Sequence, residues 1–255
     1  MNKLRMNKKI NNDHFSVKAI LNENASFGVS EAYKIARTNV MFSLAGEQGC
    51  KKIALTSALP SEGKSTASVN LAITFAQTDS KVLVIDADLR RPRVHQYMGE
   101  KNTEGLADLL AGFAELSDVI HFSSMMNIDY ISAGHIPPNP SELLESSKMQ
   151  EILEELGQVY DYIIIDTPPV SVVADALIIA KLVSGMLIVV RQKQTPHDWL
   201  KKTISSLQFA EAKILGFLLN ESATVKKRYG RKYKYGSRYS YGYGYGYYKE
   251  DVSKK

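Results

Sequence analysis

The stretch KKIALTSALPSEGKST, residues 51–66, decides the fold of this chain. An apolar run typical of a buried strand leads into a turn, and Gly63-Lys64-Ser65 then opens a helical pattern. This order matches the phosphate-binding loop, except that Ala58 stands where the first glycine is usual. Backbone N–H groups at such a helix N-terminus converge on an anion, Lys64 adds a mobile positive charge, and the Ser65 hydroxyl suits Mg²⁺. We therefore expect the following residues to bind nucleotide phosphates: Ser61, Glu62, Gly63, Lys64, Ser65 and Thr66.

Short β-branched runs alternate with amphipathic helical patterns along the rest of the chain. The patterns predict strands over 52–57, 82–86, 161–165, 186–190 and 214–219, and helices over 64–78, 141–157, 173–183 and 197–210. Within residues 99–139 the pattern predicts two short helices, near 105–111 and 115–121, and a strand near 128–132. Strands that are apolar on both faces require a parallel sheet covered by helices on both sides. The predicted fold is a doubly wound, mostly parallel α/β sheet of the P-loop NTPase type, with ligands at the carboxyl ends of its strands.

Three aspartates stand where predicted strands end. Asp86 and Asp88 lie on the same side of an extended chain after the strand 82–86, and Asp166 follows the strand 161–165. Two adjacent carboxylates beside a polyphosphate favour a divalent cation. Each aspartate alone could instead cap a turn or a helix, but three such segments in this order predict a Mg²⁺–nucleotide site.

The chain divides into three parts. Residues 1–29 are expected to form a flexible arm, residues 30–220 the folded domain, and residues 221–255 a separate tail. Ser30 is expected to cap a helix that runs to about Leu44. The inward face of that helix would carry Tyr33, Val40, Met41 and Leu44.

The tail is basic and rich in tyrosine. Residues 221–255 hold ten Lys or Arg against three acidic residues, a net charge of +7, although the whole chain carries only +5. A segment of this composition cannot bury a core of its own, so we expect it to be disordered. Its hydroxyls would remain accessible at Tyr229, Tyr233, Tyr235, Tyr239, Tyr241, Tyr243, Tyr245, Tyr247 and Tyr248.

Cysteine content and hydropathy bear on location. The single cysteine, Cys50, excludes an internal disulfide and suits a reducing compartment. No apolar run approaches the roughly 18–20 residues that span a bilayer, and no secretory signal is visible. We expect a cytoplasmic protein whose membrane association, where there is any, comes from a partner or from its charged ends.

The strand-end motifs together resemble those of one family. The phosphate loop, Asp86-x-Asp88-x-Arg90 and Asp166-Thr-Pro-Pro resemble the bacterial tyrosine kinases (BY-kinases) of capsule and exopolysaccharide biosynthesis, which are deviant Walker-type ATP-binding proteins. Ser-Ala-Gly at 132–134, followed by Pro-Pro-Asn-Pro-Ser-Glu-Leu-Leu at 137–144, also resembles that family. The resemblance covers roughly residues 30–220 and then the tail. It implies a protein tyrosine autokinase that uses ATP and Mg²⁺, transfers the γ-phosphate in trans to the tail tyrosines, and regulates polysaccharide synthesis or export.

The resemblance also implies roles for single residues. Asp88 would act as the base or positioning group for the incoming phenol, while Asp86 and Asp166 would act on Mg²⁺ together with the Ser65 hydroxyl. Lys64 and Arg90 would neutralise the phosphates. Asn220, which ends the last predicted strand, would contact adenine.

Partners follow from the same resemblance. Glu31-x-x-Lys34-x-x-Arg37 is similar to the family's oligomerisation motif, with Lys34 in place of an arginine, although a merely solvated helix face would look the same. The family forms a homo-oligomeric ring that feeds one subunit's tail into its neighbour's site. A transmembrane polysaccharide co-polymerase adaptor that activates the kinase at the inner face of the cell membrane is also implied, as is a phosphotyrosine phosphatase. Nucleic acid is not expected.

A different class of protein shares the predicted fold. Deviant Walker ATPases that position division sites or plasmids are the main alternative, with the basic tail then holding anionic lipid or nucleic acid. They typically carry a second lysine at the loop position that Leu59 occupies here. The missing lysine and the tyrosine-rich tail favour the kinase. A non-enzymatic adhesive tail would leave the acidic strand ends unexplained.

Overall fold

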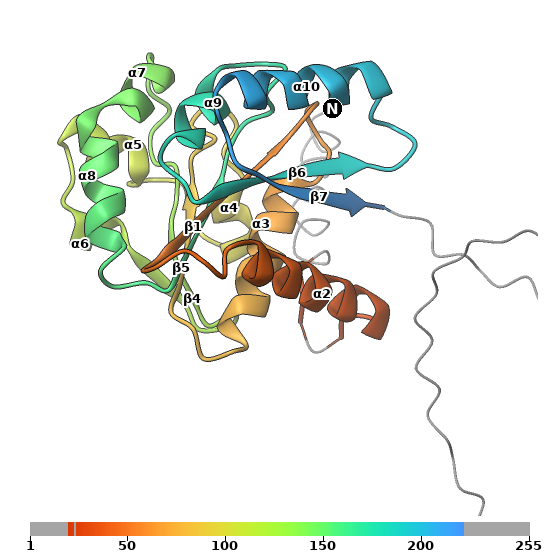
Figure 1. Cartoon of the computed structure of the whole chain (residues 1–255). Coiled ribbons are helices and arrows are strands. Elements are labelled where there is room, and N and C mark those ends of the chain that lie inside the picture. The colour runs from red at the N-terminus through yellow and green to blue at the C-terminus, as the bar shows by residue number, and fades with distance from the viewer. Residues whose placement is uncertain (1–19, 23, 222–255) are drawn as a thin grey trace, which may run out of the picture. The chain divides into compact units, whose positions relative to one another are not determined.

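A seven-stranded sheet between two layers of helices forms the core of the computed structural model, which describes residues 20–22 and 24–221 (Figure 1). The strand order is β3-β4-β2-β5-β1-β6-β7. Every neighbouring pair is parallel except β3 and β4. The strands are β1 (Lys51–Ser57), β2 (Val82–Asp86), β3 (His121–Ser123), β4 (Ile128–Ile131), β5 (Tyr162–Asp166), β6 (Gly185–Arg191) and β7 (Ile214–Asn220).

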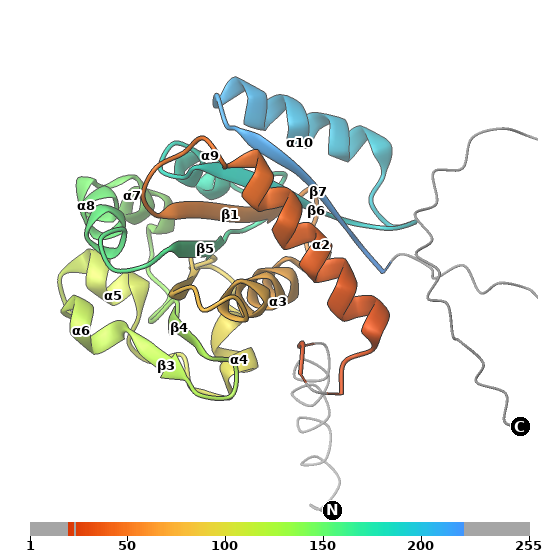
Figure 2. The same ribbon diagram turned by 60° about the horizontal axis from the view of Figure 1, so that its bottom comes forward.

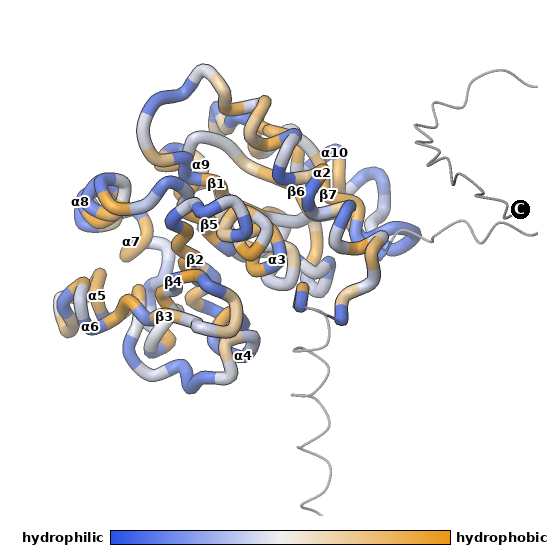
Figure 3. The backbone as a smooth tube through the Cα atoms, turned by 90° about the horizontal axis from the view of Figure 1, so that it is seen from below, coloured by the Kyte–Doolittle hydropathy of each residue, from blue (hydrophilic) through white to orange (hydrophobic). Residues whose placement is uncertain are grey.

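Helices cover both faces of the sheet, as the apolar strands require (Figure 2). Alternation along β1 sends Ile53 and Leu55 to the face covered by α2, α3 and α4, and Ala54 to the face covered by α5 to α10. The helices are α2 (Phe27–Ser43), α3 (Lys64–Ala76), α4 (Val94–Met98), α5 (Leu106–Ala111), α6 (Leu116–Val119), α7 (Pro140–Glu145), α8 (Ser147–Leu156), α9 (Asp175–Ala180) and α10 (His197–Phe209). Hydrophobic colour concentrates on the central strands and on the helix sides that face them (Figure 3). No helix among the described residues is both long and apolar enough to cross a membrane.

Strand register brings the predicted site residues to one edge of the sheet. Asp86 at the end of β2 pairs with Asp166 at the end of β5, and Asp166 also pairs with Leu55 of β1. The phosphate loop follows β1 directly. The three chemically important segments therefore leave adjacent parallel strands side by side, where a doubly wound fold binds its ligands.

The predicted fold class is confirmed, and most element boundaries are accurate. The five strands predicted along the chain end within one residue of their predicted limits, and α3 and α10 begin where predicted. Other elements differ. The single helix predicted over 141–157 is two helices, because Ser146 adopts an extended conformation with φ −65° and ψ 151°. The helix predicted over 173–183 spans only 175–180. Neither α4 nor the antiparallel edge strand β3 was predicted.

The amino-terminal part of the fold also departs from expectation. The cap of α2 is Ser26, whose Oγ accepts from the Val29 N–H at 3.4 Å, so the helix begins before Ser30. Met41 is 44% exposed, since only the stripe carrying Val40 and Leu44 faces the core. Ile20 and Leu21, placed in the expected arm of residues 1–29, are buried. The folded part of the chain therefore begins before residue 30.

Candidate active site

The phosphate loop between β1 and α3 contains two residues in the left-handed backbone region. Ser61 has φ +66° and Gly63 has φ +89°. A Cβ added to Gly63 would lie 2.0 Å from Nδ2 of Asn220, so glycine is required there for both conformation and space. The loop leads into α3, whose first residues, Lys64 and Ser65, are both buried. The backbone N–H groups at the start of α3 lie at a helix N-terminus directly after the loop, which is where we expect the phosphates to bind.

Asp86 is fully buried at the end of β2. Its Oδ2 accepts from the N–H groups of Arg93 and Val94 at 2.9 Å each. Burial, reinforced by the charge of Asp166, raises the pKa of its carboxyl well above the ordinary value. A buried carboxyl in this state has much to gain from a bound cation, because a cation would restore its charged form.

Asp166 is the paired acid on β5. It is fully buried, its Oδ1 accepts from the Ser68 hydroxyl at 3.1 Å, and its Oδ2 has no hydrogen-bond partner in the described structure. Burial raises the pKa of this carboxyl too, although the charge of Lys64 opposes the effect. An unpartnered buried carboxylate oxygen is available to a cation or a water, and Asp86, Asp166 and the Ser65 hydroxyl are the hard oxygen donors that Mg²⁺ prefers.

The protein donors alone do not form a complete metal cage. No group of three or more His, Cys, Asp or Glu side chains suited to a metal occurs within residues 20–22 and 24–221. Mg²⁺ commonly binds through one or two carboxylates plus substrate phosphates and waters. The residues present fit a cation that arrives with a nucleotide.

Asp88 and Lys64 lie together beside this pair. Lys64 Nζ is 3.7 Å from Asp88 Oδ2, and the Arg91 N–H donates to Asp88 Oδ1 at 3.0 Å. Both side chains are nearly buried. The structure thus brings together Lys64, Ser65, Asp86, Asp88 and Asp166, as the strand-end motifs predicted.

Other predicted residues have different surroundings. Arg90 points to the amino end of α9: its Nε donates to Asp175 Oδ2 at 2.9 Å, and its Nη2 donates to Asp175 Oδ1 at 3.2 Å and to Ser141 Oγ at 2.9 Å. Asp175 is fully buried. Arg90 therefore ties the loop after β2 to α7 and α9, and its guanidinium hydrogen-bonds there instead of to Asp86, Asp88 or Asp166.

Glu62 and Asn220 hold the loop in place. The Glu62 carboxylate turns inward, accepting from the Leu59 N–H at 3.0 Å and from the Thr195 hydroxyl. Asn220 Nδ2 donates to the Glu62 carbonyl at 3.0 Å, and Asn220 Oδ1 accepts from the Glu221 N–H at 2.9 Å. Sequence reasoning missed Thr195 and Arg191. Arg191 could have been found, because it ends a parallel strand next to β1.

The predicted oligomerisation residues do not share one free face. Lys34 pairs with Glu31 at 2.8 Å on the exposed side of α2. Arg37 instead turns inward, and its Nη1 donates to the Thr74 carbonyl at 2.6 Å near the end of α3. That contact satisfies a helix-terminal carbonyl within the same chain. The tail tyrosines, residues 229–248, lie outside the described residues.

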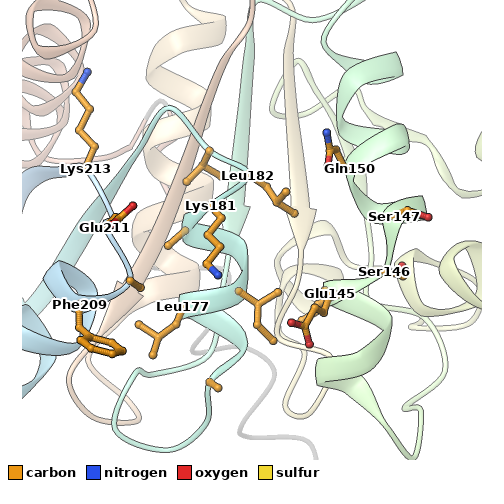
Figure 4. A pocket seen from close by; sticks show the side chains of 16 residues that line it. Glu145, Ser146, Ser147, Gln150, Leu177, Lys181, Leu182, Phe209, Glu211 and Lys213 are labelled. Carbon is orange, nitrogen blue, oxygen red and sulfur yellow. The ribbon is translucent and has the colours of Figure 1, made fainter.

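A groove of about 940 Å³ lies at the opposite edge of the sheet. It is formed by α7, α8, α9 and the end of α10, with Leu177, Leu182, Lys181 and Phe209 among its lining residues (Figure 4). Lys213, which also lines it, directly precedes β7. The groove is therefore at the amino end of that strand, whereas Lys64 and the aspartates lie at the carboxyl ends.

Comparison with known proteins identifies the family. Residues 50–214 match a family described as AAA domain. The chain is 40% identical over 191 residues to the tyrosine-protein kinase YwqD of Bacillus subtilis, covering 75% of this chain and 80% of that protein. It is 39% identical over 193 residues to the putative tyrosine-protein kinase CapB of Staphylococcus aureus, covering 76% and 84%. The kinase domain of the Escherichia coli tyrosine kinase ETK superposes with a TM-score of 0.73 at 38% identity, covering 82% of this chain and 80% of that one. The chain therefore belongs to the family of bacterial tyrosine-protein kinases.

Proposed function

We propose that this kinase transfers the γ-phosphate of ATP to the tyrosines of residues 229–248 on a second copy of the chain, in a capsule or exopolysaccharide system. The observation that carries the proposal is the placement of Lys64 beside Asp88, 3.7 Å apart, in a chain that holds nine tyrosines within those twenty positions. The unpartnered Oδ2 of Asp166 supports a Mg²⁺ requirement.

Each group has a role in the transfer. The phenol oxygen bonds to the γ-phosphorus, the bond from that phosphorus to the β–γ bridging oxygen breaks, ADP leaves, and the phenol proton passes to Asp88. Lys64 and the N–H groups at the start of α3 hold the β- and γ-phosphates. Asp86, Asp166 and Ser65 would hold Mg²⁺, which supplies positive charge where the phosphates gain negative charge.

The direct test maps the product. Purified full-length chain incubated with Mg²⁺ and ATP is expected to carry phosphate on residues 229–248, and Lys64→Met and Asp88→Asn should each abolish labelling with an unchanged circular dichroism spectrum. Absence of labelling, even with the cytoplasmic segment of an adaptor added, would contradict the proposal. Phosphate on serine or threonine alone would contradict it as well.

Transfer between copies needs a mixing experiment. One full-length chain carries Lys64→Met and an intact tail, and the other is active but carries phenylalanine at all nine tail positions. Phosphotyrosine on the Lys64→Met chain is expected, because the active copy supplies the site. If neither chain is labelled in the mixture while wild type labels itself, transfer occurs within one chain.

Two partners belong to the same proposal. A membrane adaptor would place the kinase at the inner face of the cell membrane, and a phosphotyrosine phosphatase would reset the tail. The basic charge of the tail also suits a positioning ATPase attached to anionic surfaces, but that function predicts ATP-dependent dimers without phosphotyrosine. An anti-phosphotyrosine blot separates the two functions.

A further inference from the structure

The phosphate loop contains a buried carboxylate that the proposed transfer does not use. The Glu62 side chain lies within the loop expected to bind ATP, yet the residue is only 3% exposed. A buried carboxylate is costly unless it is well hydrogen-bonded. Beside a polyphosphate its negative charge is also repulsive. Because burial and phosphate repulsion both disfavour a carboxylate here, we expect contacts through which the Glu62 side chain stabilises the loop.

The contacts of Glu62 show that its side chain acts on the loop. One oxygen accepts from the Leu59 N–H three residues back, and the other accepts from the hydroxyl of Thr195, beyond the end of β6. An ionised carboxylate is an acceptor only, as phosphate oxygens are, so the Glu62 side chain cannot hydrogen-bond to ATP phosphates. The side chain therefore closes the turn Leu59–Glu62 and fastens it to the segment after β6.

Thr195 is itself held in orientation. Its Oγ1 accepts from the Arg191 N–H at 3.0 Å, which leaves its single proton for an acceptor. The Arg191 carbonyl lies 3.2 Å away, but the Glu62 carboxylate is charged and closer, so it is the stronger acceptor. The turn 191–195 thus presents one hydroxyl hydrogen to the loop in a fixed direction.

Arg191 provides a second attachment. Its Nη1 donates to the carbonyl of Ser61 at 3.1 Å, while its Nε and Nη2 donate to the Glu221 carboxylate at 2.7 and 2.5 Å. Ser61 is the non-glycine residue of the loop with φ +66°. Such a conformation persists when surrounding contacts fix it. The Arg191 bond holds the peptide that follows this unfavourable backbone angle.

We infer that Thr195 and Arg191 are positioning residues for nucleotide binding, which set the shape of the phosphate loop through Glu62 and Ser61. This inference rests on the proposal that the loop binds ATP phosphates. It assigns the Glu62 side chain to loop geometry, and leaves its backbone N–H among the phosphate donors. Preorganised donors lower the free energy that binding would otherwise spend on ordering the loop.

The test measures ATP affinity with a fluorescent ATP analogue on the full-length chain with Mg²⁺. Thr195→Val keeps the shape of the side chain and removes the hydroxyl, and a lost hydrogen bond to a charged group predicts roughly tenfold weaker binding. Thr195→Ser restores the hydroxyl and is expected to bind within about twofold of wild type, since the donor is the same. The KM for ATP should rise in Thr195→Val, with kcat at saturating ATP nearly unchanged. Equal affinity of Thr195→Val and wild type would overturn the inference.

Two further comparisons separate positioning from other causes. Glu62→Ala should weaken binding, whereas a carboxylate that merely repelled the phosphates would give tighter binding on removal. The double variant Glu62→Ala/Thr195→Val should be no weaker than Glu62→Ala, because Thr195 acts through Glu62. Additive losses would contradict that route.

Two controls complete the design. Thr38→Val removes a hydroxyl that, among the described residues, bonds only to the Lys34 carbonyl on the exposed side of α2, so it should leave ATP affinity unchanged. Lys64→Met tests the underlying site. If wild type and Lys64→Met bind equally, the loop is not the phosphate site and the proposed function fails. If they differ while Thr195→Val matches wild type, only the positioning role fails.

Discussion

The aspartates of the site and two arginines of the predicted motifs, Arg37 and Arg90, are positioned in different ways. Asp86, Asp88 and Asp166 have short side chains at the ends of adjacent strands, and strand register alone brings two of them opposite each other. The two arginines bind partners that lie far away in the sequence. Arg37 reaches Thr74 on α3, and Arg90 reaches Asp175 on α9, 85 residues away in sequence.

The difference lies in side-chain length and in where each partner comes from. In aspartate the carboxylate is bonded directly to Cβ, so the position of the strand end largely determines the position of the carboxylate. A guanidinium at the end of a long flexible chain can reach several acceptors, and it settles on buried carboxylates or helix-terminal carbonyls that need a donor. Motif spacing therefore locates the acids of this site but not the interactions of its arginines.

The largest effect should come from a change at Asp166, whose Oδ2 has no hydrogen-bond partner among the described residues. Asp166→Asn keeps the shape of the side chain and removes the charge at the position predicted to act on Mg²⁺. We expect phosphorylation of the tail to fall by at least about 100-fold, as for other preorganised electrostatic groups. Initial rates with radiolabelled ATP measure it.

The same variant tests whether this acid is kept for function. Because the charge of Asp166 raises the pKa of Asp86, its removal relieves repulsion in the metal-free protein. Thermal unfolding in EDTA should thus show an unchanged or higher Tm. A large fall in Tm together with the lost activity would mean that Asp166 is needed for folding.

The raised carboxyl pKa values predict how stability depends on pH. Burial raises the pKa of Asp86 and of Asp166, so each carboxyl binds its proton more tightly in the folded state than in the unfolded state. Stability that these groups contribute is present below the unfolded-state pKa of about 4 and is lost as pH rises through the higher folded-state pKa. Denaturant unfolding in EDTA should show this fall.

The comparison with Asp166→Asn isolates the effect. That variant should lose less stability over the same pH range, because one titrating group is gone and the other loses its repulsive neighbour. Identical slopes for wild type and variant would contradict the assignment to this pair. Mg²⁺ with ATP should stabilise the wild type more as pH rises, since cation binding requires ionised carboxylates.

Variants of Arg90 distinguish two roles for this arginine, binding of the phosphates and stabilisation of the fold. Arg90→Ala leaves the buried Asp175 without its charged partner, and we expect a loss of about 2–3 kcal/mol in the free energy of unfolding. Arg90→Ala/Asp175→Ala should be more stable than Arg90→Ala, because the unpaired charge is removed as well. A 100-fold fall in kcat for Arg90→Ala with unchanged stability would instead place the guanidinium on the phosphates, as the family resemblance implied.

The sequence was sufficient for the parallel strands of the sheet and for the acids at their ends, but not for the antiparallel edge strand β3. The apolar strands and the glycine-lysine-serine turn have local causes, so their positions could be predicted from short stretches of sequence. The partners of Arg37, Arg90 and Arg191 lie on elements far along the chain, and only tertiary packing brings them together. The break at Ser146 escaped prediction because the helical pattern continues on both sides of it.

The smallest effects on stability are expected for α2, where Arg37 contacts α3 and Lys34 lies on the exposed side. Arg37→Ala removes the donor to the Thr74 carbonyl, and we expect a loss of about 1 kcal/mol in unfolding free energy. Lys34→Ala breaks only an exposed pair with Glu31 and should cost at most about 0.5 kcal/mol. Urea titration measures both.

The same variants test assembly. If oligomers measured by light scattering weaken in Lys34→Ala but not in Lys34→Arg, the exposed charge contributes to subunit contact as the motif implied. If Arg37→Ala destabilises the fold without changing assembly, the role of Arg37 is to pack α2 on α3. The oligomerisation motif would then consist in this chain of its outward-facing residues, Glu31 and Lys34.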